Sequence, residues 1–554
     1  MADQAPRPAP GLAVAIVGHR SNRIEDETRV EERLREILQL VGAPLVERRR
    51  LRLVSALAEG ADRLAAAAAL DGGLVLEAVL PFPPEEYARD FAGEESRAEF
   101  YRLIGGADSV LVLDGKPDAR ELAYEAVGRA LLDNCDMLIA VWDGKPGRGR
   151  GGTREVIEEA VERQLPIVLV RPDGASSALL RRPSNSADVE RLEDLVERPI
   201  EEVAALYSPL VGAAAQEKID RYWLAREGLP RRSWLYGAYP LLLRLVGQGP
   251  KKAKGAAADA PQSDPDQLPM ARAFAWWDGT AICAAQAFRS AVIVNFALAA
   301  FAVLLAVASL LAGKAKWMFV LAEVTTILLL LANAWYAGRK RWQERWLESR
   351  EIAEMLRVCL MLREVGIGRA LAGDGKGRWG ADYVRAFARA APLRSTDLSD
   401  PAAASRPLLA DIAGQAVWNE ATAKRMHRTA HRLERVGDVL FVLVLTAAIA
   451  WLALGLVDAG SADRLKYLLT FVTAGFPAVA TASYGIRIIL DFQGISERAE
   501  RMAGALRSLL DAWEQAPPSA AALQAFARGA ADVLLGDVSA WRLLAEGRRL
   551  SIPG

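Results

Sequence analysis

Three glycine-containing turns in the first part of the chain carry the residues best suited to hold an anion. They lie within or directly after the segments LAVAIVG, LRLVSALAEG and IAVWDGKPGRGRGG. Glycine lets a backbone approach a ligand closely, and the amide groups at the start of a following helix favour negative charge. We therefore expect a phosphate-bearing, nucleotide-like ligand. The candidate ligand-binding residues are Gly18, His19, Arg20, Ser55, Glu59, Gly60, Asp62, Arg63, Pro81, Asp143, Gly144, Gly151, Gly152 and Thr153.

Charged side chains near these turns leave several roles open. Asp62, Asp90 and Asp143 could act as an acid, a base or a ribose-binding group. Asp62 could equally cap the helix that follows it, and His19 could contact a phosphate or a base, or cap a helix. The arginines expected to contact phosphate are Arg20, Arg63, Arg148 and Arg150.

Strands that alternate with helices are needed to bring these turns together. The apolar runs LAVAIVG, LRLVS, LVLEAVL, DSVLVLD, CDMLIAV and PIVLV predict buried strands, and helical patterns lie between several of them. Such alternation favours a parallel sheet, whose ligands bind at the carboxyl ends of the strands. The predicted fold class is a doubly wound, Rossmann-like α/β sheet followed by an all-α four-helix transmembrane domain with long cytoplasmic helices.

A family resemblance adds to this interpretation. The segments VGHR, SALAEGADRLA, LPFPPEEYARDF and IAVWDGKPGRGRGGTREV, in this order and spacing, resemble the SLOG superfamily of Rossmann-like nucleotide-binding domains over roughly residues 11–175. The resemblance implies a domain that senses a nucleotide-derived second messenger.

One departure separates this chain from the SLOG members that hydrolyse nucleoside monophosphates. Their PGGxGTxxE signature places a carboxylate three residues after the threonine, whereas that position is Val156 here. Glu155 is displaced from it by about 100° around a helix. We therefore expect sensing in preference to hydrolysis. The alternative is a membrane-anchored nucleotide hydrolase or phosphoribohydrolase.

Four nearly uncharged runs in the second half are long enough to cross a membrane, since roughly 20 residues at ~1.5 Å each span a bilayer core. Arg339, Lys340 and Arg341 follow the first hairpin, whereas its connector carries only Lys314 and Lys316. This asymmetry predicts a multi-pass membrane protein with both termini in the cytoplasm. The predicted spans are 291–312, 317–337, 439–457 and 468–490.

Polar residues within these spans should face protein or water, because an ionisable group in hydrocarbon is costly. Asn295 lies at a depth where it could meet Asn333 on the second span. Such residues could line a conduction path, or they could form hydrogen bonds that hold the bundle together. The pore-lining candidates are Asn295, Glu323, Thr326, Asn333, Thr470, Thr473 and Thr481.

The two hairpins look like copies of one unit, because ESREIAEMLR and SERAERMAGALR follow them at corresponding positions. Pseudo-symmetric bundles of this kind are expected to form homo-oligomers. The architecture resembles the SLATT class of bacterial membrane effectors, which accompany SLOG domains in antiphage conflict systems. That resemblance implies a protein of the bacterial inner membrane whose membrane part permeabilises this membrane in response to a messenger. The messenger would be made by a neighbouring nucleotide synthase. A nucleotide-regulated transporter or scaffold is a further alternative.

The expected partners are a nucleotide ligand, the lipid bilayer and further copies of the chain, and composition excludes one other class. The 69 basic and 69 acidic residues balance, and no basic domain stands out, which argues against a nucleic-acid partner. Cys135, Cys283 and Cys359 lack the spacing of a disulfide framework or a zinc site, so we expect no metal and no cofactor beyond the ligand.

The predicted organisation has six parts. They are a SLOG-like domain at 1–175, a helical coupler at 176–248, a flexible linker at 249–267, the first hairpin with its cytoplasmic helices at 268–380, a loop-rich connector at 381–415, and the second hairpin with its helices at 416–554.

Overall fold

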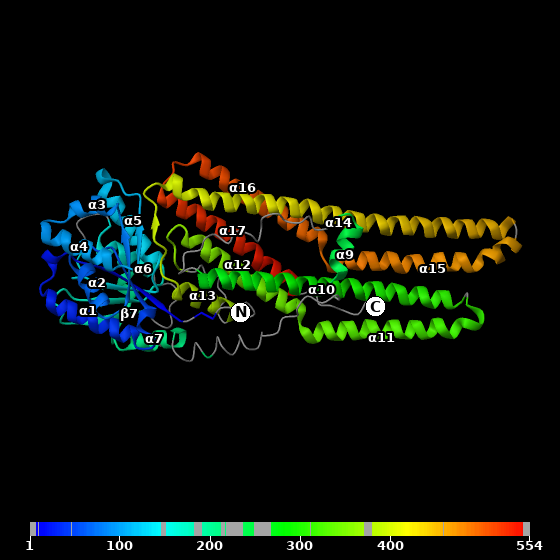
Figure 1. Ribbon diagram of the computed structural model, residues 1–554, viewed down its shortest axis with the longest axis horizontal. Coiled ribbons are helices and arrows are strands. Elements are labelled where there is room, and N and C mark those ends of the chain that lie inside the picture. Colours follow the sequence, from blue (N-terminus) through cyan, green and yellow to red (C-terminus); the bar gives the residue numbers. More distant parts are fainter. Residues whose placement is uncertain are drawn as a thin grey trace.

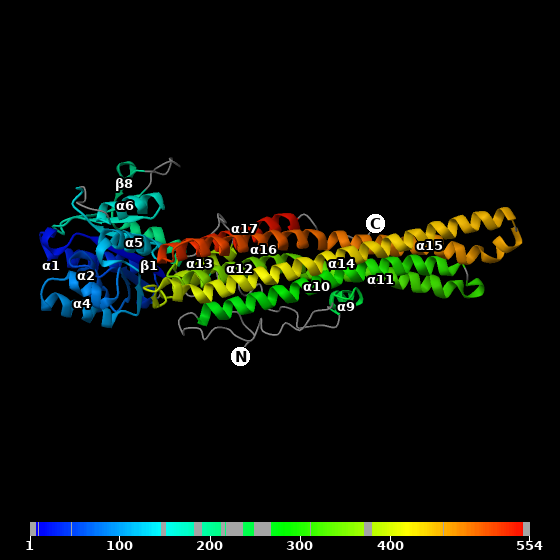
Figure 2. The same ribbon diagram turned by 90° about the horizontal axis from the view of Figure 1, so that it is seen from above.

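A computed structural model places an α/β domain at one end of a long rod of helices (Figures 1 and 2). The structure describes residues 7–8, 10–45, 47–145, 151–181, 191–211, 217, 237–248, 268–310, 312–369, 379–457 and 459–546. The predicted linker at 249–267 lies outside the described residues, as do Arg148 and Arg150.

One nine-stranded sheet organises the α/β domain, in the order β8-β7-β6-β5-β1-β2-β3-β4-β9. Every pair from β6 to β9 along this order is parallel, which confirms the predicted doubly wound fold class. The strands are β1 Leu12–Gly18, β2 Leu51–Ser55, β3 Val75–Leu80, β4 Ser109–Val112, β5 Met137–Val141, β6 Ile167–Val170, β7 Ser177–Arg181, β8 Val196–Arg198 and β9 Thr396–Asp397.

The sheet buries both faces, so its strands show the period of two expected of extended chain. From β1, Val14 and Ile16 join a core with one set of helices, while Ala15 and Val17 join a core on the opposite face. The first set is α1 Glu27–Gly42, α2 Ala61–Asp71, α4 Glu94–Gly106 and α7 Glu202–Val211. The opposite face carries α5 Arg120–Asp133 and α6 Thr153–Glu162.

Two regions differ from the predicted organisation. In place of a helical start to 176–248, β7 and β8 extend the sheet as antiparallel strands, and the α-helices among the described residues there are α7 and α9 (Ala238–Leu245). The connector at 381–415 is also mostly regular, because α13 (Trp379–Ala390) and α14 (Pro401–Val457) enter it from either side of β9. Packing against the sheet and the core outweighs the loop-like composition of both segments.

The helical half packs directly onto the α5/α6 face of the sheet. Leu362 of α12, Ile412 of α14, Leu506 of α16 and Phe526 of α17 belong to the same apolar core as Ala15 of β1. These helices span Trp342–Arg363 (α12), Phe492–Gln515 (α16) and Ala520–Glu546 (α17). The α/β domain and the rod are therefore joined by a continuous core as well as by the chain.

Four helices are long and apolar enough to cross a membrane: α10 Leu268–Ser309, α11 Lys316–Lys340, α14 and α15 Ala459–Ile489. Their apolar segments lie at the end of the rod away from the α/β domain (Figure 1). Large apolar side chains there are exposed, among them Phe441 at 68% and Leu452 at 64%. A solvent of hydrocarbon accounts for such a surface, whereas water does not.

The two hairpins repeat the same local geometry. α11 and α15 each end at a residue in the left-handed region, Arg341 (φ 50°) and Asp491 (φ 51°), and the next residue is a buried aromatic in both cases. Eight positions before each break, a polar side chain donates to a carbonyl of the preceding helix. Asn333 Nδ2 donates to Ala291 O at 3.0 Å, and Ser483 Oγ donates to Leu433 O at 3.0 Å.

The same correspondence is visible in the sequences of α10 and α14. AWWDGTA, from position 275, matches VWNEATA, from position 417, at the same place relative to those two acceptor carbonyls. Thr280 and Thr422 within these segments are both buried. The helical half is therefore built from two related units, α10–α12 and α14–α16.

Candidate nucleotide-binding cleft

A cleft of about 520 Å³ opens beside the carboxyl ends of β1 and β5. β1 pairs with β2 on one side and with β5 on the other, so the chain winds in opposite directions from this point. Open α/β sheets bind ligands where the strand order reverses in this way. The cleft residues that the sequence singled out are Gly18, His19, Arg20, Asp62, Pro81, Gly151, Gly152 and Thr153.

The glycines of the first two turns serve close packing of the protein on itself. A Cβ at Gly18 would lie 2.5 Å from Ala61 Cβ and 2.8 Å from Val141 Cβ. Gly60 has φ 95°, and a Cβ there would overlap the carbonyl of His19. Ala61 N donates to His19 O at 3.1 Å, which holds the two turns together. These glycines shape the cleft, and Gly60 itself does not line it.

His19 is buried and is held by the loop after β5. The Asp143 N–H lies 3.1 Å from His19 Nε2, and Asp143 Oδ1 lies 3.0 Å from the same nitrogen. One nitrogen cannot accept from the amide and donate to the carboxylate at once, so the tautomer selects one contact. Partial burial alone would raise the pKa of Asp143, but the Lys145 N–H, His19 and Arg23 together lower it below its ordinary value. Asp143 therefore holds His19 in place and does not itself line the cleft.

The turn at the start of α6 is the strongest candidate for a phosphate cradle. Gly151, Gly152 and Thr153 line the cleft, and amides at a helix start favour an anion. Glu155 reaches back to this turn, and its Oε2 accepts the Gly151 N–H at 2.6 Å. One amide of the cradle therefore already donates its hydrogen bond to a carboxylate. Glu155 does not line the cleft, in keeping with the displacement expected from its spacing.

Cationic side chains give the cleft a positive rim. Arg20 and Lys145 line it, and neither side chain has a carboxylate partner among the described residues. Arg23 lies 3.8 Å from Asp143, and Arg154 pairs with Glu158 at 2.7 Å. Arg20 and Lys145 are consequently the cations best placed to bind a phosphate.

Among the described residues, Asp62 is the one buried carboxyl group that lines the cleft. Burial raises its pKa to about 7, against the lowering effect of the Ala58 and Ala56 amides and of Arg63. Tyr87, which also lines the cleft, is close enough to Asp62 that the carboxylate raises its pKa further than burial alone does. A carboxyl group that titrates near neutrality can bind ribose or transfer a proton.

Besides Gly60 and Asp143, four more predicted ligand residues lie outside the cleft. Arg63, expected to contact phosphate, donates to Leu57 O at 3.1 Å and to Ser96 Oγ at 2.8 Å. Glu59 accepts a hydrogen bond from Ser96, so the same serine joins both. Ser55 Oγ accepts the Leu57 N–H at 3.1 Å and fixes the turn after β2. Gly144 has φ 83° and lies beyond the cleft wall.

Helix α5 forms a wall of the cleft that the sequence did not indicate. Tyr124 and Gly128 line the cleft from this helix. Tyr124 Oη donates to Asp90, and a Cβ at Gly128 would lie 2.7 Å from Val156 of α6. The only sequence feature that could have indicated this wall is Gly128, a small residue where α5 packs against α6. Further cleft residues that the sequence did not single out are Asn22, Arg23, Val127, Leu131, Trp142, Lys145 and Arg154.

Within the apolar helices, the expected meeting of Asn295 and Asn333 is observed. Asn333 Nδ2 donates to Asn295 Oδ1 at 2.6 Å, and Asn295 is buried. Thr326 is buried and bonds back to Ala322 O at 2.8 Å within its own helix. Glu323 and Thr473 are half-buried, whereas Thr470 and Thr481 are exposed. The single chain therefore does not bring all the pore candidates to one interior face, and their role in conduction stays a prediction.

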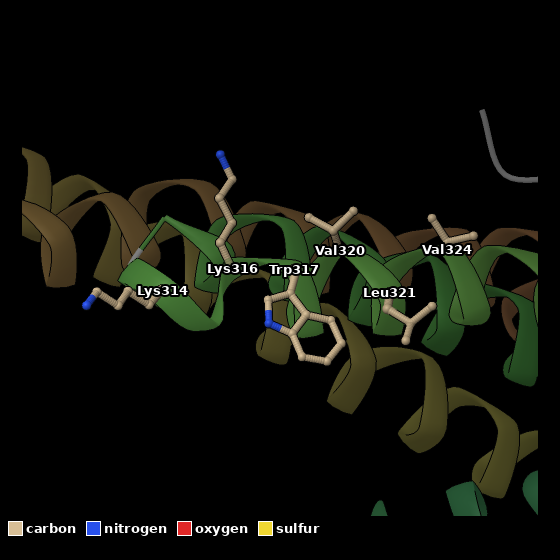
Figure 3. A pocket seen from close by; sticks show the side chains of 6 residues that line it. All are labelled: Lys314, Lys316, Trp317, Val320, Leu321 and Val324. Atoms are coloured by element: carbon tan, nitrogen blue, oxygen red, sulfur yellow. The ribbon is translucent and has the colours of Figure 1, made fainter.

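A second hollow lies at the turn before α11 and along the start of that helix, and Figure 3 shows the side chains that line it. It is bordered by Lys314, Lys316, Trp317, Val320, Leu321 and Val324, all from one helix and the turn before it. The two lysines point in different directions and do not converge on a common centre (Figure 3). A lipid-facing helix surface with interfacial Trp and Lys has this composition. No group of His, Cys, Asp and Glu suited to a metal ion is found among the described residues.

Fold and cleft define this protein as a Rossmann-like α/β domain joined to four apolar helices. No family model matches the chain, and no curated protein matches it. Among solved structures, the X-ray structure of DNA processing protein A (DprA) from Streptococcus pneumoniae is similar at 22% identity and a TM-score of 0.22. The match covers 29% of this chain and 50% of that chain, and at this TM-score it decides nothing about function.

Proposed function

We propose that this protein is a membrane-bound effector whose α/β domain binds a nucleotide in the cytoplasm and whose four apolar helices respond to it. The observation that carries the proposal is a cation-rimmed cleft on a domain that shares its core with the long helices. The single helix α14 runs without interruption from Ile412 in that core to the apolar run that begins at Val439. A ligand that favours one packing of the domain can therefore bias the helices in the membrane.

The resemblance to SLOG and SLATT proteins supports a more specific assignment. Under it, the ligand is a nucleotide-derived second messenger, and the response is permeabilisation of the bacterial inner membrane during antiphage defence. Further copies of the chain would be needed to surround a pore, since one copy leaves Thr470 and Thr481 on its outer surface.

Dye-filled vesicles carrying the full chain test this function. Mono-, di- and cyclic nucleotides would be added and leakage recorded, with binding measured by calorimetry on the same protein. Arg20→Ala should weaken both binding and leakage because it removes a cation of the cleft. Arg49→Ala is the matched control. Arg49 is 70% exposed and lies just before the amino-terminal end of β2, whereas the cleft lies at the carboxyl ends of the strands. Absence of binding heat with every nucleotide would refute the proposal.

Nucleotide hydrolysis is the second candidate, and Asp62 favours it. A carboxyl group with a pKa of about 7 inside a cleft is suited to general acid–base catalysis. The engagement of Glu155 with Gly151 weighs against the hydrolytic signature of the SLOG enzymes. Product analysis by chromatography would separate the two functions: released base or phosphate that disappears in Asp62→Asn favours an enzyme.

A further inference from the structure

Helix α9 lies across the long helices at the level where the apolar segments begin (Figures 1 and 2). Its first turn is fixed to α10, where Tyr239 N–H donates to Ser290 Oγ at 3.1 Å. Its last turn is fixed to α14, because Arg432 donates to Val246 O. Ser290 directly precedes the first predicted span. If α10 and α14 cross the membrane, α9 therefore runs parallel to its cytoplasmic surface.

α9 presents apolar side chains on two opposite faces. Tyr239 and Leu243 are buried in a core with Trp342 and Phe492, the aromatic residues after the two helix breaks. Leu241 and Leu245 point the other way and are 55% and 76% exposed. Two residues of helix rotate the side-chain direction by about 200°, which explains this division. The outer face is apolar, and the described part of the chain does not cover it.

Charge around α9 matches an acidic lipid surface. Arg244 is exposed on α9, and Arg428, Arg432 and Arg435 are exposed on the neighbouring part of α14. Helices that lie in a membrane interface combine an apolar face with flanking cations, and anionic lipids attract such cations. A lipid surface explains why α9 lies where the predicted spans begin. Contact with a second copy of the chain would not explain this position.

We propose that α9 is an interfacial helix that inserts Leu241 and Leu245 into the cytoplasmic leaflet of the membrane. It would bind acidic phospholipid and so couple the lipid surface to both helical units at their breaks. This inference rests on the proposed function, because it requires α10 and α14 to span the bilayer.

Depth-dependent fluorescence quenching of the full chain tests the inference. Leu245→Cys would be labelled with a bimane dye in a Cys283→Ser background, since Cys135 and Cys359 are buried. The protein would be reconstituted in phosphatidylcholine and phosphatidylglycerol vesicles. A spin label near the lipid headgroup should cause a loss of fluorescence, and aqueous iodide should cause little. The Leu241→Cys label should behave alike.

Labels at two further positions distinguish a failure of this inference from a failure of the proposed function. Val417→Cys, on an exposed part of α14 in the cytoplasmic rod, should be quenched by iodide and not by lipid labels. Leu329→Cys, on α11, should be quenched by a label deep in the acyl chains. Iodide quenching at Leu245→Cys, or protection from both quenchers, overturns the inference alone. Failure of Leu329→Cys to meet lipid overturns the membrane-spanning part of the proposed function as well.

Discussion

Gly60 shows how one backbone conformation holds two turns of the cleft together. Its φ of 95° and the overlap of a Cβ with His19 O leave no room for a side chain. Gly60→Ala should destabilise the full chain by about 2 kcal/mol or more, since strain and collision add. Gly73→Ala is the matched control: its φ is 69°, but no atom lies within 4 Å of a Cβ. Equal melting temperatures for the two variants would show that overlap with His19 O does not destabilise Gly60→Ala.

Glu155 competes with any anion for the cradle at the start of α6. Its Oε2 accepts the Gly151 N–H at 2.6 Å, so a phosphate must displace it to use that amide. A hydrogen bond to a charged group contributes about 1.5–3 kcal/mol, hence Glu155→Gln should bind pyrophosphate roughly ten times more tightly. Calorimetry on the full chain measures this change. Glu162→Gln, at the far end of α6, should leave the affinity unchanged.

Asp62 predicts a pH dependence of stability. Burial raises its pKa from 3.8 to about 7, so between these values the folded protein keeps a proton that the unfolded chain has lost. Stability therefore falls as the pH rises through this window, by on the order of 4 kcal/mol in full. Asp62→Asn stays neutral, and its melting temperature relative to the unmutated protein should increase from about pH 5 to about pH 8.

The control for this prediction is Asp71→Asn, an exposed carboxyl group at the end of the same helix. It should show no such trend. A melting-temperature difference for Asp62→Asn that stays constant with pH would mean that Asp62 is ionised in the folded protein throughout the range.

Residue types and spacing located the cleft but did not assign every role within it. Gly18, Arg20 and Thr153 follow strands at the carboxyl edge, and topology alone brings such positions together. Arg63 also follows a strand, yet its side chain turns toward Ser96 and lies 4.2 Å from the Phe91 ring. Which way a long side chain turns depends on partners distant in sequence, so spacing could not separate Arg63 from Arg20.

At the scale of elements, α5 connects the cleft to the helical half. Its middle lines the cleft, and Asp133 at its end binds Arg163, the residue directly after α6, at 2.7 Å and also Arg528 of α17. Asn134, the next residue, donates to Gly366 O at 2.8 Å and accepts the Gly368 N–H at 2.6 Å. Under the proposed function, a rigid helix held at both places would connect ligand binding to the membrane helices.

Arg528→Ala should separate binding from response. The pair with Asp133 is partly exposed, so its loss should cost less than about 1 kcal/mol and leave nucleotide affinity unchanged. Nucleotide-dependent leakage should fall several-fold, because α17 loses its ion pair with α5 while their apolar contact remains. Arg35→Ala removes a comparable ion pair within α1, away from the helical half, and should leave leakage intact. Equal leakage from both variants would exclude this route.

Short elements account for most of the differences between expectation and structure. β9 is two residues long, and β8 is three, so neither carries enough alternation to be predicted as a strand. β9 joins the sheet because Val110 N–H donates to Ser395 Oγ at 3.2 Å and Leu398 N–H donates to Val112 O at 2.8 Å. The long apolar helices and the first six strands, by contrast, have strong periodic patterns and were predictable.

At the scale of the whole molecule, the predicted boundary between the front α/β domain and the helical half does not separate two independent hydrophobic cores. Glu77, fully buried in β3, pairs with Arg52 at 2.7 Å and also accepts the Leu393 N–H at 2.6 Å from beyond the first hairpin. Leu111 and Val127 share a core with Leu362 and Phe526. Contacts between segments so far apart in sequence leave no local signal, which is why the sequence suggested a self-contained front domain.

The shared core predicts that a fragment of residues 1–248 does not fold as a stable unit. It would lack β9, the Leu393 N–H bound by Glu77, and the apolar helices that cover α5. Apolar surface left in water favours a loosely packed state, which binds a dye such as anilinonaphthalene sulfonate and loses near-ultraviolet circular dichroism. Coexpression with a fragment of residues 268–554 should restore packing, because both halves of the core are then present. A monodisperse front fragment with a cooperative thermal transition would show that the α/β domain is stable alone and that the helices merely rest against it.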